Sequence, residues 1–196
     1  MAQNVPQPFS PVPDAGASFK ASYLAEYGLD YDGAIRPMTA LIESDSRNYA
    51  ASARLGWLHY LKGAHAESER HYKNAIRLVP TTSECRVGLM APLLAQRKYE
   101  EVETLGRQLT QNGDGGNYWG MLRMCYAQRM QGKYEPARSL AVRMLTLYPT
   151  DVNFLVEQGY AHAARGENDA ARKCFKQVQV YDPDNTWAKQ FLEQVK

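Results

Sequence analysis

A 34-residue period is the feature that most constrains the fold of this chain. Two segments, residues 49–82 and 152–185, carry small, large and proline residues at the same spacings after a first glycine. The matching positions are Gly56, Gly63, Ser68, Tyr72, Ala75 and Pro80 in one segment, and Gly159, Gly166, Ala171, Phe175, Val178 and Pro183 in the other. A period of this length is typical of stacked supersecondary units, none of which buries its apolar face alone.

Weaker copies of the pattern fill the remaining chain. Counting the period in both directions predicts five repeats, with one extra residue near Asn117. Their boundaries are 15–48, 49–82, 83–116, 118–151 and 152–185.

The two ends of the chain differ from the repeats. Residues 1–14 hold four prolines and almost no charge, which predicts an extended, flexible Pro-rich arm. Residues 186–196 predict a capping helix in which Trp187, Phe191 and Val195 form one apolar face against the fifth repeat. Asp184 and Asn185 are both candidates for its N-cap.

The repeats resemble the tetratricopeptide repeat (TPR), a 34-residue helix–turn–helix unit with small and large apolar residues in register and a closing proline. The resemblance implies an all-α fold, a right-handed α-solenoid of stacked helix–turn–helix repeats. The chain departs from the pattern where Ser46 and Asp114 replace the closing proline. Gly106 also replaces the large residue that Tyr72 and Phe175 supply in the clearest copies.

Composition excludes several classes of function. A formal net charge of +2 argues against nucleic-acid binding. The sequence contains no run of about 18 apolar residues, so we expect no membrane-spanning helix. Three dispersed cysteines form neither a disulfide framework nor a local zinc motif, and Cys125 replaces a close-contact glycine, which predicts buried packing. We find no catalytic, cofactor-binding or metal-binding motif and therefore expect no enzyme activity and no cofactor.

The four histidines could suggest ligands, but their spacing favours structural roles. His59, His65 and His71 are six residues apart, which predicts different faces or elements. His59 and His162 share a register position where TPRs usually have a packed tyrosine, so both are expected to pack.

In TPR stacks the first helices of successive repeats line a concave groove, and their register predicts which residues face it. An aromatic row is expected at one register position and a charged row three residues earlier. The aromatic row is Tyr23, Trp57, Ala91, Tyr126 and Tyr160, and the charged row is Lys20, Arg54, Gly88, Arg123 and Glu157. The candidate groove residues are Tyr23, Arg54, Trp57, Tyr60, Trp119, Arg123, Tyr126, Arg129 and Tyr160.

Aromatic residues and arginine dominate binding hot spots, so the sequence favours a non-enzymatic adaptor that binds a protein or peptide segment. A ligand with aromatic or proline residues and some acidic character fits this composition. A carboxylate clamp on three consecutive repeats is not supported, because only Arg54 suits its positions. Two alternatives stay open: the aromatic rings pack between helices, or the chain self-assembles by stacking or dimerisation.

The compartment also stays open. No signal peptide is present in the sequence as given, yet Ala2, Gln3 and Asn4 before a polar Pro-rich segment are typical of an exported mature terminus. This favours a bacterial periplasm or envelope over the cytoplasm. The unpaired cysteines favour the opposite.

Overall fold

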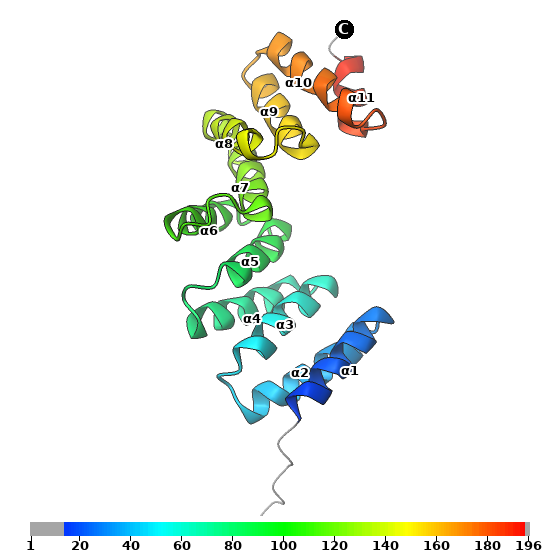
Figure 1. Ribbon diagram of the computed structural model, residues 1–196, viewed down its shortest axis with the longest axis vertical. Coiled ribbons are helices and arrows are strands. Elements are labelled where there is room, and N and C mark those ends of the chain that lie inside the picture. Colours follow the sequence, from blue (N-terminus) through cyan, green and yellow to red (C-terminus); the bar gives the residue numbers. More distant parts are fainter. Residues whose placement is uncertain (1–13, 195–196) are drawn as a thin grey trace, which may run out of the picture. The chain divides into compact units, whose positions relative to one another are not determined.

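The chain forms helical pairs throughout the part that the structure describes, residues 14–194 of the computed structural model (Figure 1). No strand occurs in these residues, which confirms the all-α fold class. The helices are α1 (Ala15–Tyr27), α2 (Tyr31–Ser44), α3 (Tyr49–Leu61), α4 (His65–Leu78), α5 (Ser83–Ala95), α6 (Tyr99–Gln111), α7 (Tyr118–Met130), α8 (Tyr134–Leu147), α9 (Val152–Ala164), α10 (Asn168–Tyr181) and α11 (Thr186–Gln194).

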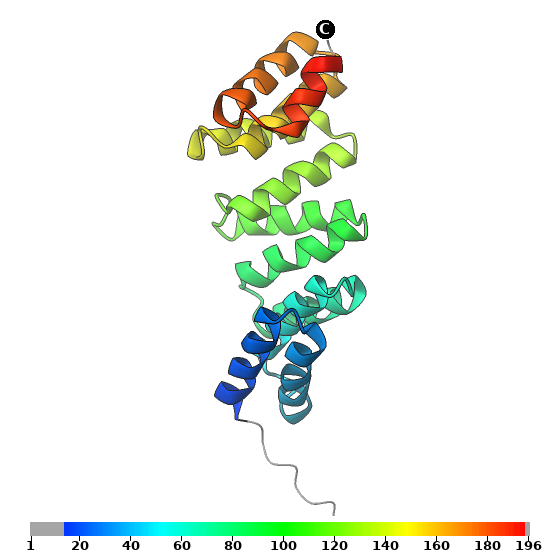
Figure 2. The same cartoon turned by 90° about the vertical axis from the view of Figure 1, so that its right-hand side faces the viewer.

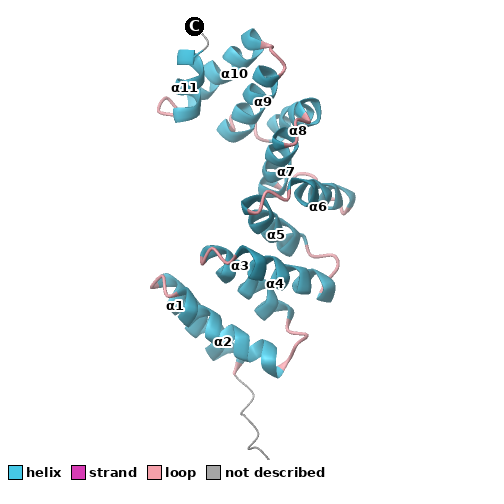
Figure 3. Cartoon of the chain, turned by 180° about the vertical axis from the view of Figure 1, so that it is seen from behind, coloured by secondary structure: helices cyan, strands magenta, loops and turns pink. Residues whose placement is uncertain are grey.

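Two compact units divide the chain between Pro80 and Thr81. The N-terminal unit holds α1 to α4, and the C-terminal unit holds α5 to α11. Inside each unit short loops join successive helices that pack side by side (Figures 2 and 3). In the C-terminal unit α5 also contacts α7, and α7 contacts α9, so first helices of successive repeats are neighbours. None of the helices in residues 14–194 is both long and apolar enough to cross a bilayer.

The first helices begin where a capping side chain recurs with the period of the sequence. Asn117 Oδ1, for example, accepts the backbone N–H of Gly120 at 2.9 Å, and Asn185 Oδ1 accepts that of Ala188 at 3.1 Å. Such bonds satisfy donors that a helix N-terminus leaves unpaired. The capping residues are Asp14, Asn48, Thr82, Asn117, Asp151 and Asn185. Of the two N-cap candidates for α11, the structure selects Asn185.

The turn inside each repeat contains one residue with a left-handed backbone conformation. Glycine fills it in three repeats, at Gly63, Gly132 and Gly166, with φ between 74° and 80°. The other two repeats place Leu29 and Arg97 there, with φ of 60° and 58°. Because side chains with a Cβ rarely adopt this conformation, both residues are unusual.

Close approach of the two helices of a repeat depends on a glycine facing an aromatic ring. A Cβ atom on Gly56 would lie 2.7 Å from Cγ of Tyr72, and one on Gly159 would lie 2.8 Å from Cε2 of Phe175. Both rings are buried. At Gly106, where the repeat pattern lacks a ring, the thioether of Met124 occupies the space that a Cβ would need.

Helix α11 packs on the fifth repeat through a different face from the one predicted. Ala188 and Phe191 are buried in a cluster with Leu155, Phe175 and other apolar residues of α9 and α10. The Phe191 and Phe175 rings stack with centroids 4.3 Å apart. Trp187, however, is 55% exposed, so the expectation that its ring joins this core was wrong. Val195 and residues 1–13 of the predicted Pro-rich arm lie outside the described residues, whereas Asp14 caps α1.

Replacing Gly56 by alanine tests the helix–ring contact. We expect Gly56→Ala to reduce the free energy of unfolding by about 1–3 kcal/mol, because the added methyl overlaps the Tyr72 ring. Gly16→Ala is the matched control, since the nearest atom to its Cβ is 3.4 Å away and alanine favours helix. Chemical denaturation of both variants measures the difference. An equal effect of the two substitutions would contradict the contact.

Candidate functional site

The predicted groove residues divide between the two units. Tyr23, Arg54, Trp57 and Tyr60 belong to the N-terminal unit, whereas Trp119, Arg123, Tyr126, Arg129 and Tyr160 belong to the C-terminal unit. Ala91, the apolar member of the aromatic row, is buried on α5. Each set is therefore described within its own unit.

In the N-terminal unit a charged pair links α1 and α3. Nη2 of Arg54 lies 2.5 Å from Oε2 of Glu26, and Nε of Arg54 donates to Ser22 Oγ at 3.2 Å. The Arg54 guanidinium also lies 3.9 Å from the centre of the Tyr23 ring. Arg54 is 8% exposed, so the structure buries a cation that the sequence suggested would face a ligand.

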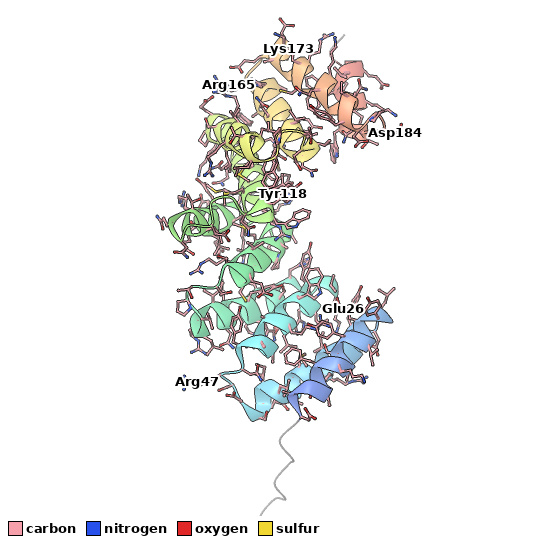
Figure 4. All side chains as sticks on the ribbon, in the orientation of Figure 1. Glu26, Arg47, Tyr118, Arg165, Lys173 and Asp184 are labelled. Atoms are coloured by element: carbon pink, nitrogen blue, oxygen red, sulfur yellow. The ribbon has the colours of Figure 1, made fainter. Side chains whose placement is uncertain are left out.

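The other groove residues of this unit surround that pair. Trp57 Nε1 donates to Oε1 of Glu26 at 2.8 Å, and the Trp57 ring lies 6.0 Å from that of Tyr60. Figure 4 labels Glu26 near the end of α1. A shallow cavity of about 540 Å³ lies here, lined by Tyr23, Glu26, Tyr27, Leu29, Arg54 and Trp57. With both Glu26 oxygens and the Arg54 guanidinium already engaged, its surface is mainly apolar.

In the C-terminal unit an equivalent pair links α7 and α9. Arg129 donates from Nε to Oε2 of Glu157 at 2.7 Å and from Nη2 to Oε1 at 3.1 Å. Its guanidinium lies 5.1 Å from the centre of the Tyr126 ring and 5.0 Å from that of Tyr160. Burial acts to lower the pKa of Arg129, but the hydrogen bonds and charge of Glu157 outweigh it and raise the pKa. Arg129 is thus a fixed cation clamped between two rings.

The two pairs have the same geometry in the repeat with opposite polarity. Arg54 and Glu157 share the charged row, and Glu26 and Arg129 share a register three residues beyond the aromatic row. In each case the residue three positions beyond the aromatic row of one repeat pairs with the charged-row residue of the next repeat. The repeat scaffold therefore accepts the ion pair in either orientation.

Between the third and fourth repeats the same two positions are Leu94 and Arg123, so no carboxylate stands at that register.

Arg123 takes a different arrangement from Arg129. Its Nη1 donates to the backbone carbonyl of Val87 at 2.7 Å, and its guanidinium lies 5.8 Å from the Trp119 ring centre. Trp119 itself is 57% exposed and packs edge-on against Tyr118, with centroids 5.0 Å apart.

These side chains enclose a cavity of about 410 Å³ within the C-terminal unit. It is lined by Leu94, Trp119, Leu122, Arg123, Tyr126, Arg129, Asn153, Val156, Glu157, Tyr160, Asn185 and Trp187. All five groove residues that the sequence placed in this unit line it. Desolvation raises the pKa of Tyr160 in this wall, which keeps its hydroxyl protonated.

Tyr118 (labelled in Figure 4) packs beside the cavity lining. Its hydroxyl accepts a hydrogen bond from Asn153 Nδ2 at 2.7 Å, and its ring packs edge-on against Phe154 and Tyr148. Burial raises the pKa of the Tyr118 hydroxyl. The start of α7 and the start of α9 are thereby held together beside the cavity.

Trp187 is the cavity residue that the sequence analysis assigned elsewhere. Its ring lies 6.3 Å from that of Tyr160, and it lines the cavity rather than the core. A signal was present in the register, because Trp187 follows Asn153 by one period and Asn153 follows Trp119 by one period. The N-cap Asn185 keeps the same register. Helix α11 therefore keeps the register of a first helix.

The histidines and Cys125 are packing residues in the structure. His59 lies on α3 and His71 on α4, in line with the prediction of different elements, and their rings stack with centroids 5.1 Å apart. Burial lowers the pKa of both rings, that of His71 to about 4. Cys125 is buried, its Sγ donates to the Ala137 carbonyl at 3.1 Å, and burial raises its pKa. Within residues 14–194 no three metal-ligating side chains gather into a candidate metal site.

Comparison with known proteins identifies the repeats. The family model described as Tetratricopeptide repeat matches residues 19–81, which include the first, degenerate repeat. Residues 19–81 therefore match the tetratricopeptide repeat family, and the described chain has the helical-repeat fold of that family. No curated protein sequence matches it.

Solved structures extend the TPR fold over nearly the whole chain. The structure of MamA protein is 16% identical, with 86% of this chain and 91% of that chain covered at a TM-score of 0.78. The structure of YrrB, described as a TPR protein with an unusual peptide-binding site, is 15% identical, with 92% and 93% covered and a TM-score of 0.75. A TPR protein from Parabacteroides merdae ATCC 43184 is 14% identical, with 92% and 71% covered and a TM-score of 0.82. At these identities the likeness concerns the fold.

Exchanging the charges of Arg129 and Glu157 tests whether the repeat scaffold accepts this ion pair in either orientation. We expect Arg129→Glu and Glu157→Arg each to reduce the free energy of unfolding by about 3–5 kcal/mol, because each places like charges in a largely buried site. The double variant should regain most of that loss, since Arg54 and Glu26 already occupy these register positions in the opposite order. Denaturant unfolding measures all three variants.

The exposed ion pair between Lys189 and Asp184 supplies the control. Lys189→Glu should change the free energy of unfolding by less than about 1 kcal/mol, because solvent screens that pair. A double variant no more stable than the weaker single variant would contradict the interchangeable geometry.

Proposed function

We propose that this protein is a non-enzymatic interaction scaffold that binds a segment of a partner protein in the cavity between α7, α9 and α11. The observation that carries the proposal is the pair of half-exposed tryptophans, Trp119 and Trp187, that two different helices contribute to one cavity. Tryptophan is enriched among the side chains that dominate binding energy, because a large ring loses much apolar surface to water on contact.

The dimensions and rigidity of the cavity support the same function. Its volume of about 410 Å³ lies in the usual range for ligand sites, which suits one or two side chains of an extended segment. Arg129 is held by Glu157 and by the rings of Tyr126 and Tyr160. Side chains fixed before binding lose less conformational entropy when the ligand arrives.

The charges of the lining favour an acidic group on the ligand. Arg123 and Arg129 contribute two positive charges and Glu157 one negative charge, which leaves a formal charge of +1. We assign the orientation of a ligand carboxylate to Arg123, because this cation lines the cavity beside the exposed ring of Trp119. The aromatic walls suit proline or aromatic side chains, since extended Pro-rich segments dock on such surfaces.

Similarity to YrrB is consistent with this proposal, because that protein's description records a peptide-binding site on the same fold. The N-terminal groove residues receive a different role. Arg54 and Trp57 both hold Glu26, so we assign them to the α1–α3 contact rather than to ligand binding.

The test is selection from a phage-displayed peptide library followed by calorimetric titration of the selected peptides. We expect peptides rich in proline or aromatic residues together with Asp or Glu. Trp119→Ala and Trp187→Ala should each weaken their binding by about 30-fold, the loss of roughly 2 kcal/mol typical of a hot spot. Arg123→Glu should weaken the acidic peptides selectively, through repulsion.

Trp57→Ala is the matched control, because this tryptophan lies in the other unit. It should leave peptide affinity unchanged. Circular dichroism melts of every variant separate lost binding from lost folding. Unaltered affinity in Trp119→Ala and Trp187→Ala, with both variants folded, would overturn the assignment of the cavity.

A further inference from the structure

Helix α1 presents a large apolar surface that no other part of the described chain covers. Of the twelve large hydrophobic side chains exposed within residues 14–194, four lie between positions 23 and 29. They are Tyr23, Leu24, Tyr27 and Leu29, with 51%, 64%, 91% and 73% of their surface exposed. Scattered apolar residues are normal on a protein surface, but a cluster of this density marks an interaction site.

The composition of α1 is that of a buried helix. Between Ala15 and Leu29 only Lys20 and Glu26 are charged, and Glu26 already binds Arg54 and Trp57. Helices that are apolar on every side are found in protein interiors. One side of α1 meets α2 and α3, through residues such as Phe19 and Ser22. The opposite side faces solvent.

Leu29 adds an independent observation. It holds a φ of 60°, the left-handed conformation that three other repeats give to glycine. Its side chain gains nothing from burial, because 73% of it is exposed. Leu29 thus adds exposed apolar surface directly after α1.

We propose that the exposed face of α1 is a homodimer interface, in which two copies of the chain pair through antiparallel α1 helices. The face is self-complementary. Exposed Ala17 and Ala21 lie on the same side of the helix as Leu24. An antiparallel pairing centred between positions 22 and 23 sets Leu24 of each copy against Ala21 of the other, a large residue against a small one.

The exposed area agrees with a second copy as the occupant. The four exposed side chains offer roughly 500 Å² per copy, so a symmetric pair buries on the order of 1,000 Å² before the flanking residues are counted, which reaches the size of a specific interface. This dimer is independent of ligand binding in the C-terminal cavity.

Sedimentation velocity over a concentration series tests the proposal with the full chain. We expect the wild type to reach twice the monomer mass of 22.1 kDa. Leu24→Glu should weaken dimerisation at least tenfold while circular dichroism stays unchanged, because the side chain is exposed in the monomer. Val180→Glu is the matched control, since Val180 is 74% exposed on α10 and should leave the dimer intact.

Disulfide trapping tests the antiparallel register. The native cysteines Cys85, Cys125 and Cys174 are buried, so an added cysteine reports its own contacts. Mixing Ala21→Cys with Leu24→Cys should yield mainly cross-linked pairs of the two variants, whereas Val180→Cys should not cross-link. A wild type that stays monomeric, or a dimer that Leu24→Glu leaves unchanged, would overturn the proposal. So would dimerisation that begins only after residues 1–13 are deleted, because that segment would then be the occupant.

Discussion

An ion pair between the first helices of neighbouring repeats determines the character of both groove surfaces. Glu26 with Arg54, and Arg129 with Glu157, each place opposite charges at one contact where rings cover the guanidinium. Charges at such depth require partners, because desolvation is costly for an unpaired ion. We propose that the paired residues support the rings beside them instead of recognising a ligand.

The cavity of the C-terminal unit spans a junction that lacks this pair and the next junction, which has it. Leu94 stands where Glu26 and Arg129 stand in the two paired junctions, and Arg123 bonds to the Val87 carbonyl and lies beside Trp119. The next junction carries the clamped Arg129, and α11, the last described helix, contributes Trp187. A rigid charged centre thus lies between two exposed tryptophans. Helix α1 has an exposed apolar face, and no first helix precedes it within the described residues.

The sequence predicts the repeat architecture well, because its signals are local. Each glycine–ring contact lies inside one repeat, so the sequence spacing predicts it. The structure has both contacts, Gly56 with Tyr72 and Gly159 with Phe175. Burial of Cys125 follows from the same register. The family match to residues 19–81 also covers a first repeat whose own pattern is weak.

Side-chain pairing between helices was harder to predict. Arg54 is buried instead of exposed because Glu26, on another helix, pairs with its guanidinium. The stacking of His59 on His71 arises from the packing of α3 on α4. Trp187 was misplaced for a different reason. The amphipathic pattern of residues 186–196 taken alone puts Trp187 and Phe191 on one face, whereas the repeat register assigns burial to Ala188 and Phe191.

Binding of the partner segment in one cavity of the C-terminal unit is tested most directly by NMR of the tryptophan indoles. The chain contains three tryptophans, so its spectrum holds three indole N–H signals, which single substitutions assign. On titration with a selected peptide, we expect the signals of Trp119 and Trp187 to shift together with one dissociation constant, while that of Trp57 stays in place. A shift of Trp57 alone, or of none of the three at saturating peptide, would contradict binding in this cavity.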